Sequence, residues 1–204
     1  MRAAAQAWAL VALATSVAVP CAAKTFSAFS IGGSSARLAA ANGSYATCPT
    51  ALGVLAFGWK IGERPFYAML EGETFRIYQI DPMGTLTGDG APRHEGIGLG
   101  TGLLWSINEW QIEAALVQGK VQAEQESPNG PRRHKFSYFT PRIEAGFALF
   151  SSAGARIALN VGVRRVMLSD LWHEQYGYKD IWAAHALAAL YLTVARDHRF
   201  FESD

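Results

Sequence analysis

The residues of this 204-residue chain that could do chemistry are mostly acids and bases spaced two apart. Glu71 and Glu73 form one such pair, and Arg142 and Glu144 form another. Residues two apart point to the same face of a β-strand, so these side chains are expected on one side of a sheet. The full set assigned to that side is Glu71, Glu73, Glu113, Arg142, Glu144, Arg156, Arg164 and His185.

The near balance of charge in this cluster has two interpretations. Acids and bases held side by side neutralise one another, which compensates the cost of burying each ion. The same charges could instead line a polar conduit that selects a solute, because rings of charge set pore preference. A glycine row at 96, 98, 100 and 102 leaves room on one wall for either arrangement. We favour a paired plug, and the sequence leaves the conduit open.

The elements that must position these residues are strands. In 155–164, one face carries Ile157, Leu159, Val161 and Val163, and the other carries Arg156, Asn160 and Arg164. This period of two, with one wholly apolar face, is typical of half-buried strands. Stretches of this kind are expected at 25–32, 51–61, 65–79, 94–107, 110–123, 136–150, 155–168 and 180–196.

The connections between these eight stretches are expected to alternate in length. Short turns follow the second, fourth and sixth, at 62–64, 108–109 and 151–154. Long connections follow the others, with turn formers at 32–34, 88–90 and 127–130. Short periplasmic turns and longer extracellular loops are typical of barrels in the bacterial outer membrane, with the apolar face toward lipid. A soluble lipocalin-like barrel is the alternative.

The start of the chain predicts export. Met1-Arg2 precedes an apolar run at 3–19, and Cys21-Ala22-Ala23 fits a signal-peptidase site. We therefore expect a signal peptide at 1–23 and one barrel domain at 24–204. An acylated Cys21 is the alternative, which Pro20 disfavours. After cleavage Cys48 remains as a single cysteine, so no internal disulfide is expected.

Aromatic residues are expected to form belts at the two membrane–water interfaces. Trp59, Trp105 and Trp110 lie at strand ends next to the short turns. The opposite belt is expected to contain Tyr78, Tyr138, Phe139 and Trp182.

The last strand carries an apolar stripe, whose members are Trp182, Ala184, Ala186, Ala188, Leu190, Leu192 and Val194, and Phe200 shares their parity. In this pattern the chain resembles the small bacterial outer-membrane barrels of the OmpA-barrel, OmpX, OmpW and opacity-protein group. The resemblance implies an eight-stranded antiparallel up-and-down transmembrane barrel in the outer membrane, closed without a partner and hence a monomer. The sequence departs from the group's pattern at Arg196 and His198, and Phe200 is not terminal.

Two loop features are candidate contact sites. One is the basic run with Arg132, Arg133 and Lys135, suited to lipopolysaccharide phosphates or an anionic host surface. The other is an aromatic group in the fourth long loop, formed by Trp172, Tyr176 and Tyr178. Exposed aromatic residues often anchor contacts. The net charge of +1 gives no indication of nucleic acid as a partner.

The resemblance leaves three functions open, of which we favour the first and keep the second as its alternative. The first is a surface-exposed barrel with a narrow channel for small solutes, as in the OmpW type. The second is a non-conducting surface protein or adhesin whose loops bind a partner, as in the OmpX and opacity types. The third is a lipid A-modifying hydrolase or acyltransferase, for which the available residues are Ser169, Asp170, His173 and Glu174, with His185 lower in the last strand. A lone loop histidine is a poor catalyst candidate, so no enzyme, catalytic residue, metal site or cofactor is expected.

Overall fold

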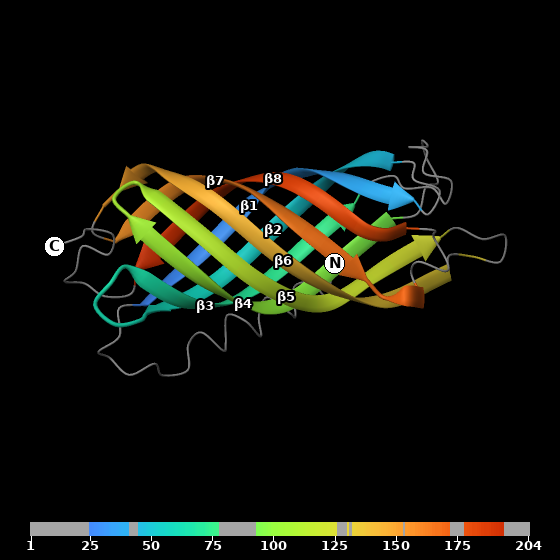
Figure 1. The fold of residues 1–204 in the computed structure, drawn as a ribbon, viewed down its shortest axis with the longest axis horizontal. Coiled ribbons are helices and arrows are strands. Elements are labelled where there is room, and N and C mark those ends of the chain that lie inside the picture. Colours follow the sequence, from blue (N-terminus) through green and yellow to red (C-terminus); the bar gives the residue numbers. More distant parts are fainter. Residues whose placement is uncertain are drawn as a thin grey trace.

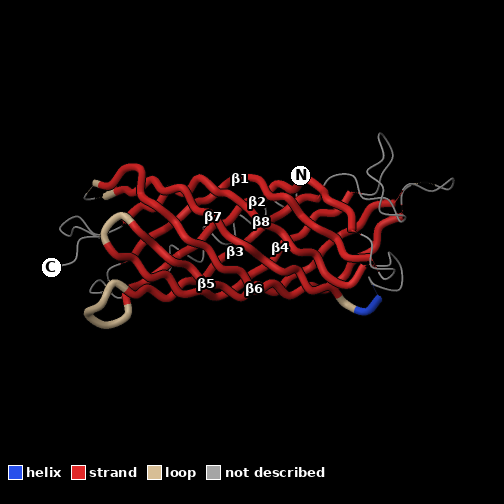
Figure 2. The backbone as a smooth tube through the Cα atoms, turned by 45° about the horizontal axis from the view of Figure 1, so that its top comes forward, coloured by secondary structure: helices blue, strands red, loops and turns tan. Residues whose placement is uncertain are grey.

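In a computed structural model, the chain forms one closed barrel of eight antiparallel strands, each paired with its neighbours in chain order (Figures 1 and 2). The structure describes residues 25–40, 45–77, 93–125, 130, 132–152, 154–171 and 178–193. The strands are β1 (Thr25–Ala40), β2 (Tyr45–Lys60), β3 (Phe66–Ile77), β4 (Arg93–Ile107), β5 (Trp110–Gln125), β6 (Arg132–Ser151), β7 (Ala155–Leu168) and β8 (Tyr178–Thr193). Within these ranges no helix is long and apolar enough to cross a membrane.

The eight predicted strands are confirmed, but the first connection is much shorter than expected. β1 runs on to Ala40 and β2 begins at Tyr45, so the segment at 32–34 lies inside a strand and not in a loop. Gly32 faces Leu52 on one side and Leu187 on the other. A Cβ at Gly32 would collide with the backbone of Ala186. This glycine therefore marks close approach of β1 and β8, a use of glycine within strands that resembles a turn signal in sequence.

The three short turns gather at one end of the barrel, and the ends of β1, β3, β5 and β7 lie at the other (Figure 1). The two-residue turn between β4 and β5 contains Asn108 with a φ of 52°, a conformation that asparagine tolerates. In an outer-membrane barrel the end with short turns faces the periplasm. We call it the turn end, and the opposite end the loop end.

Side chains alternate between the inside and the outside of the barrel along every strand. The outward face carries large exposed apolar residues, such as Leu99, Leu149 and Val161. The inside contains three layers. An aromatic layer near the turn end includes Phe26, whose ring lies 5.6 Å from that of Tyr67 and 5.8 Å from that of Tyr191.

A second apolar layer fills the inside toward the loop end, with Leu52, Phe75 and Phe136 among its members. Most of the buried charged residues lie between these two layers. Along β3, for example, Glu71 and Glu73 lie between Met69 of the aromatic layer's cluster and Phe75 of the second layer. An apolar outer face with a polar interior section is the arrangement of a transmembrane barrel and the reverse of a soluble one.

Candidate functional site

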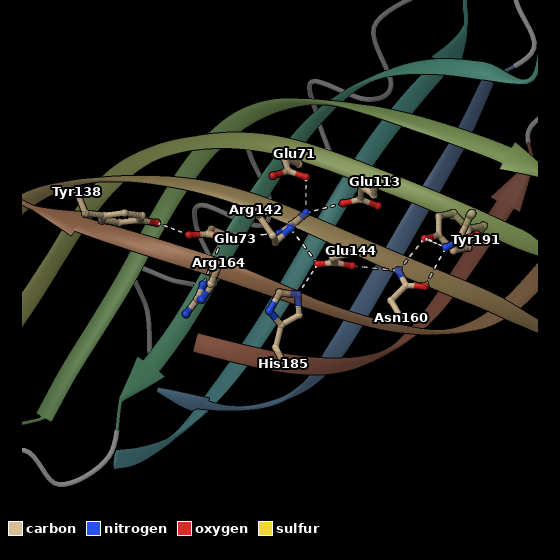
Figure 3. A network of polar contacts seen from close by, with 11 residues as sticks. Glu71, Glu73, Glu113, Tyr138, Arg142, Glu144, Asn160, Arg164, His185 and Tyr191 are labelled. Atoms are coloured by element: carbon tan, nitrogen blue, oxygen red, sulfur yellow. Dashed lines mark hydrogen bonds and ion pairs between the residues drawn. The ribbon is translucent and has the colours of Figure 1, made fainter. Parts of the chain in front are cut away.

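The centre of the barrel is occupied by the guanidinium of Arg142 on β6, surrounded by four carboxylates (Figure 3). Its Nη2 donates hydrogen bonds to Glu71 Oε2 at 2.7 Å and to Glu113 Oε1 at 2.6 Å. Its Nε lies 2.9 Å from Glu144 Oε1, and its Nη1 lies 3.7 Å from Glu73 Oε2. The acids come from β3, β5 and β6. A single cation on β6 therefore ties β6 to β5 and, across the interior, to β3.

Two side chains on the loop-end side of Arg142 contact Glu73. Tyr138 Oη donates to Glu73 Oε1 at 3.0 Å. Arg164 Nη1 lies 3.5 Å from Glu73 Oε2, and its guanidinium packs 4.6 Å from the centre of the Phe75 ring. Arg164 is thus stabilised both by charge and by an aromatic face.

Glu144 is held by two further groups. His185 Nε2 lies 2.9 Å from Glu144 Oε1, and Asn160 Nδ2 donates to Glu144 Oε2 at 3.1 Å. Asn160 also donates to Tyr191 Oη at 3.1 Å, and Gln111 Nε2 donates to Asn160 Oδ1 at 2.9 Å. This amide–tyrosine network was not predicted. Its only sequence signal is that Gln111, Asn160 and Tyr191 share the parity of the inward residues on their strands.

The strand register explains why Arg142 is needed. Glu113 lies directly opposite Glu144, and Arg142 lies directly opposite Arg164. Like charges directly opposite each other in a sheet are destabilising. Insertion of the Arg142 guanidinium between the carboxylates turns this repulsion into attraction.

Glycines on β4 supply the space for the long side chains. Gly98 and Gly100 lie opposite Glu73 and Glu71. A Cβ at Gly98 would meet Val117 Cγ1 at 2.7 Å and crowd the Tyr138 hydroxyl. The missing side chain therefore lets Tyr138 reach Glu73 across the barrel.

The structure places seven of the eight predicted lumen residues in this network and the eighth apart from it. Arg156, also buried, lies near the turn end, where Nη1 donates to Ser106 Oγ at 2.7 Å and Nη2 donates to the carbonyl of Asn108 at 2.6 Å. Arg156 therefore fastens the β4–β5 turn. We name the other seven residues the charged plug, namely Glu71, Glu73, Glu113, Arg142, Glu144, Arg164 and His185.

The charged plug contains more acids than bases. Four glutamates face two arginines and His185, and all seven side chains are buried. Glu71 Oε1 has no hydrogen-bond partner in the described part of the chain. Glu71 is therefore hydrogen-bonded through one carboxylate oxygen, whereas Arg142 lies within ion-pair distance of all four glutamates.

The structure describes some of the residues that were predicted to make contacts from loops, and it corrects the placement of the basic run. The basic run was expected in a loop, but β6 begins at Arg132, so the run belongs to a strand. The expectation of a loop was wrong because β5 extends to Gln125 and Arg132 pairs with it, so the hairpin strands include the basic run. Arg133 and Lys135 are exposed on the outward face. Trp172, Tyr176 and the side chains of Arg132 and Tyr178 lie outside the described residues, as does the predicted signal peptide at 1–23.

The predicted aromatic residues near the turn end point outward. Trp105 is 37% exposed and stacks on Phe66, while Trp110 is 61% exposed and packs against Phe147. Trp59 is half-buried beside Phe57.

Tyr138 was expected in the opposite belt, and this was wrong. It points inward because its neighbour Phe139 points outward, and adjacent strand residues face opposite sides. Trp182 is exposed on the outer face, and Arg165 packs over its ring at 5.3 Å.

Of the residues considered for lipid hydrolysis, the structure describes Ser169, Asp170 and His185. Ser169 contributes its backbone amide to the carbonyl of Ser137, and His185 is bonded to Glu144 deep inside the barrel. His173 and Glu174 lie outside the described residues. Among the residues that the structure describes, no group of His, Cys, Asp and Glu side chains is arranged to hold a metal ion.

No protein-family model matches the chain, and no curated protein sequence matches it. Solved structures do. The Neisserial surface protein A superposes with a TM-score of 0.51 at 9% identity, over 82% of this chain and 96% of that one. Ail, the attachment invasion locus protein of Yersinia pestis, superposes with a TM-score of 0.53 at 11% identity, over 83% and 99%. A second Ail structure, in complex with the heparin analogue sucrose octasulfate, gives 0.52 at 13% identity, over 81% and 99%. The chain therefore has the fold of the small eight-stranded barrels of the bacterial outer membrane.

Proposed function

We propose that this protein is a non-conducting barrel on the bacterial surface whose extracellular loops bind a partner. The observation that carries the proposal is the charged plug. The interior of an eight-stranded barrel is only wide enough to be filled by side chains or to hold one small ligand. Here Arg142 and its four carboxylates cross that interior from wall to wall.

The plug is backed by apolar side chains on both sides. Toward the turn end, Phe26, Tyr67 and Tyr191 are each no more than 1% exposed. Toward the loop end, Leu52, Val117 and Val166 are equally buried. A hydrated solute would have to break paired charges and then pass two dehydrated layers, which argues for a closed lumen.

The similar structures favour the same class of function. One is described as a surface protein and another as an attachment and invasion protein. The longest segments between strands, 78–92 and 169–177, follow β3 and β7, which both end at the loop end. We assign partner binding to these loops, and to Trp172, Tyr176 and Tyr178 as its aromatic anchors. The partner is an extracellular protein or glycan.

The test is adherence of bacteria that express the full-length chain in the outer membrane of a non-adherent strain. Binding to an epithelial monolayer is compared with a vector control and with a variant in which Trp172, Tyr176 and Tyr178 are changed to serine. We expect adherence above the vector control and its loss in the variant, at equal surface expression. Added heparin then assigns the partner, because competition indicates a polyanionic glycan. Adherence no greater than that of the vector control would contradict the proposal.

A further inference from the structure

The charged plug is short of positive charge even when every base in it is counted. Its four glutamates face Arg142, Arg164 and His185, so at least one carboxylate has no cation to balance it. Arg156 shares the interior, but it is engaged at the β4–β5 turn. A carboxylate buried without a partner is so costly that such a group normally takes up a proton and becomes neutral.

Glu71 is the acid whose charge the structure stabilises least. Its Oε2 accepts from Arg142 Nη2 at 2.7 Å, and the same nitrogen also donates to Glu113 Oε1 at 2.6 Å. Its Oε1 is buried and has no hydrogen-bond partner in the described chain. The side chain of Glu71 is 0% exposed, against 8% for Glu113, so water does not supply the missing contact.

Two other acids of the charged plug have donors of their own. Glu73 accepts a hydrogen bond from Tyr138 Oη at 3.0 Å. Glu144 lies 2.9 Å from His185 Nε2 and accepts from Asn160 Nδ2 at 3.1 Å. Hydrogen bonds of this kind stabilise the ionised form of each carboxyl group. Glu71 has only its share of Arg142 within the described chain.

The walls beside Glu71 add no charge. Ala56 on β2 and Gly100 on β4 lie directly opposite it. The titratable groups that face the interior from the described strands are Cys48 on β2, Tyr67 and Glu73 on β3, His94 on β4, Glu113 on β5, His134, Tyr138, Arg142 and Glu144 on β6, Arg156 and Arg164 on β7, and His185 and Tyr191 on β8. Of the cations among them, Arg142 is the one that forms an ion pair with Glu71.

We propose that the charged plug is a proton-binding site, in which Glu71 Oε1 holds a proton in the folded barrel at neutral pH. The proton comes from the solvent when the chain folds. It occupies the oxygen that has no partner, so the hydrogen bond from Arg142 to Oε2 is kept. Three carboxylates then face three bases, and their charges balance when His185 is protonated. This inference does not depend on what the loops bind.

A small metal cation is the competing source of positive charge, and the geometry argues against it. Mg²⁺ and Ca²⁺ take about six oxygen ligands or more. Among the residues that the structure describes, no group of His, Cys, Asp and Glu side chains is arranged to hold a metal ion. The single unpartnered oxygen of Glu71 is sufficient for a proton.

Proton uptake makes the stability of the barrel depend on pH in the direction opposite to that of an ion-paired acid. A glutamate in the unfolded chain has a pKa of about 4.3 and is mostly ionised above about pH 5. The folded barrel then binds one proton more than the unfolded chain, so its stability falls as the pH rises. The folding equilibrium constant decreases about tenfold per pH unit until Glu71 releases its proton in the folded state.

The test is urea unfolding of the barrel in lipid vesicles between about pH 5 and about pH 7, for the unchanged protein and for Glu71→Gln. Glutamine takes up no proton and keeps an oxygen that accepts from Arg142. The folding constant of the variant, divided by that of the unchanged protein, should therefore rise about tenfold per pH unit and about a hundredfold in all. The control is Glu95→Gln, which removes an outward acid paired with Arg76. Its ratio should stay constant within about twofold.

A second measurement uses the unchanged protein alone and identifies the carboxyl group that holds the proton. Carbon NMR of the barrel in nanodiscs, with the Glu71 Cδ signal assigned through its own backbone, should show the chemical shift of a protonated carboxyl at neutral pH. Replacement of sodium by a large organic cation should leave this signal unchanged. The inference is overturned if the Glu71→Gln ratio does not change with pH. It is also overturned if Glu71 Cδ has the shift of a carboxylate, or if the signal depends on sodium.

Discussion

Replacement of Arg142 by methionine is the sharpest perturbation of the charged plug. Methionine keeps much of the side-chain length but removes the cation and its donors. Nη2 alone donates to Glu71 and Glu113 at 2.7 and 2.6 Å, and Nε pairs with Glu144 at 2.9 Å. The variant leaves four buried carboxylates facing one another around an apolar group.

The size of the expected loss of stability follows from the burial of Arg142 and its carboxylate partners. Arg142 is 3% exposed and its carboxylate partners are 1–6% exposed, so solvent does not screen the lost attraction. Removal of one partner of a buried ion pair costs about 3–5 kcal/mol, because it leaves an uncompensated charge. We therefore expect the folding equilibrium constant to fall by roughly a hundredfold to several thousandfold, since about 1.4 kcal/mol is a factor of ten.

The assay is reversible urea unfolding of the barrel in lipid vesicles, followed by tryptophan fluorescence. The matched control is Arg165→Met, which removes an outward arginine from a partly exposed pair with Asp180. Exposed pairs contribute about 0–1 kcal/mol, so the control should change little.

Adding Glu71→Gln and Glu113→Gln to Arg142→Met should recover about 1–3 kcal/mol of the loss, because contacting residues couple energetically. A loss below about 0.5 kcal/mol for Arg142→Met, within the range of an ordinary surface substitution, would refute the reasoning.

Two further variants test the charge balance and the space that the plug requires. Glu71→Gln should change the free energy of unfolding by less than about 1 kcal/mol in the same urea assay at about pH 5. The plug has more acids than bases, and the amide oxygen of glutamine still accepts a hydrogen bond from Arg142. A loss as large as that of Arg142→Met would contradict this expectation. Gly98→Ala should cost about 1–3 kcal/mol of overpacking and weaken the Tyr138–Glu73 hydrogen bond. Gly33→Ala, an outward glycine whose Cβ would meet only a carbonyl at 3.6 Å, is its control and should be neutral or stabilising; equal losses at both positions would show that the lumen is not tightly packed at Gly98.

The period of two made the strands and the inward direction of most charges predictable from sequence. In β7 the buried Arg156, Asn160 and Arg164 alternate with exposed apolar residues. Parity says which side a residue faces, but it does not say at what height it lies. Arg156 and Arg164 share a face yet fasten different regions, because Arg156 lies at the start of β7 and Arg164 lies much farther along the same strand.

The predictions from sequence were wrong where the local composition is typical of a different structure. Gly32 and Gly33 look like a turn but lie within β1, where Gly32 allows β1 and β8 to approach and Gly33 points outward. Tyr138 looks like an interface aromatic, but only one of Tyr138 and Phe139 can face lipid. Contacts such as Gln111–Asn160 depend on the register of distant strands, which single-strand periodicity does not contain.

Single-channel recording in planar bilayers tests the central claim, a lumen closed by the charged plug. The unchanged barrel is compared with a variant in which Arg142 and Arg164 are both replaced by methionine, with correct folding of each checked beforehand. We predict that the unchanged barrel gives no discrete conductance steps. Steady unitary steps from the unchanged barrel, with a size or ion preference that changes in the variant, would contradict the account and establish a charge-lined channel.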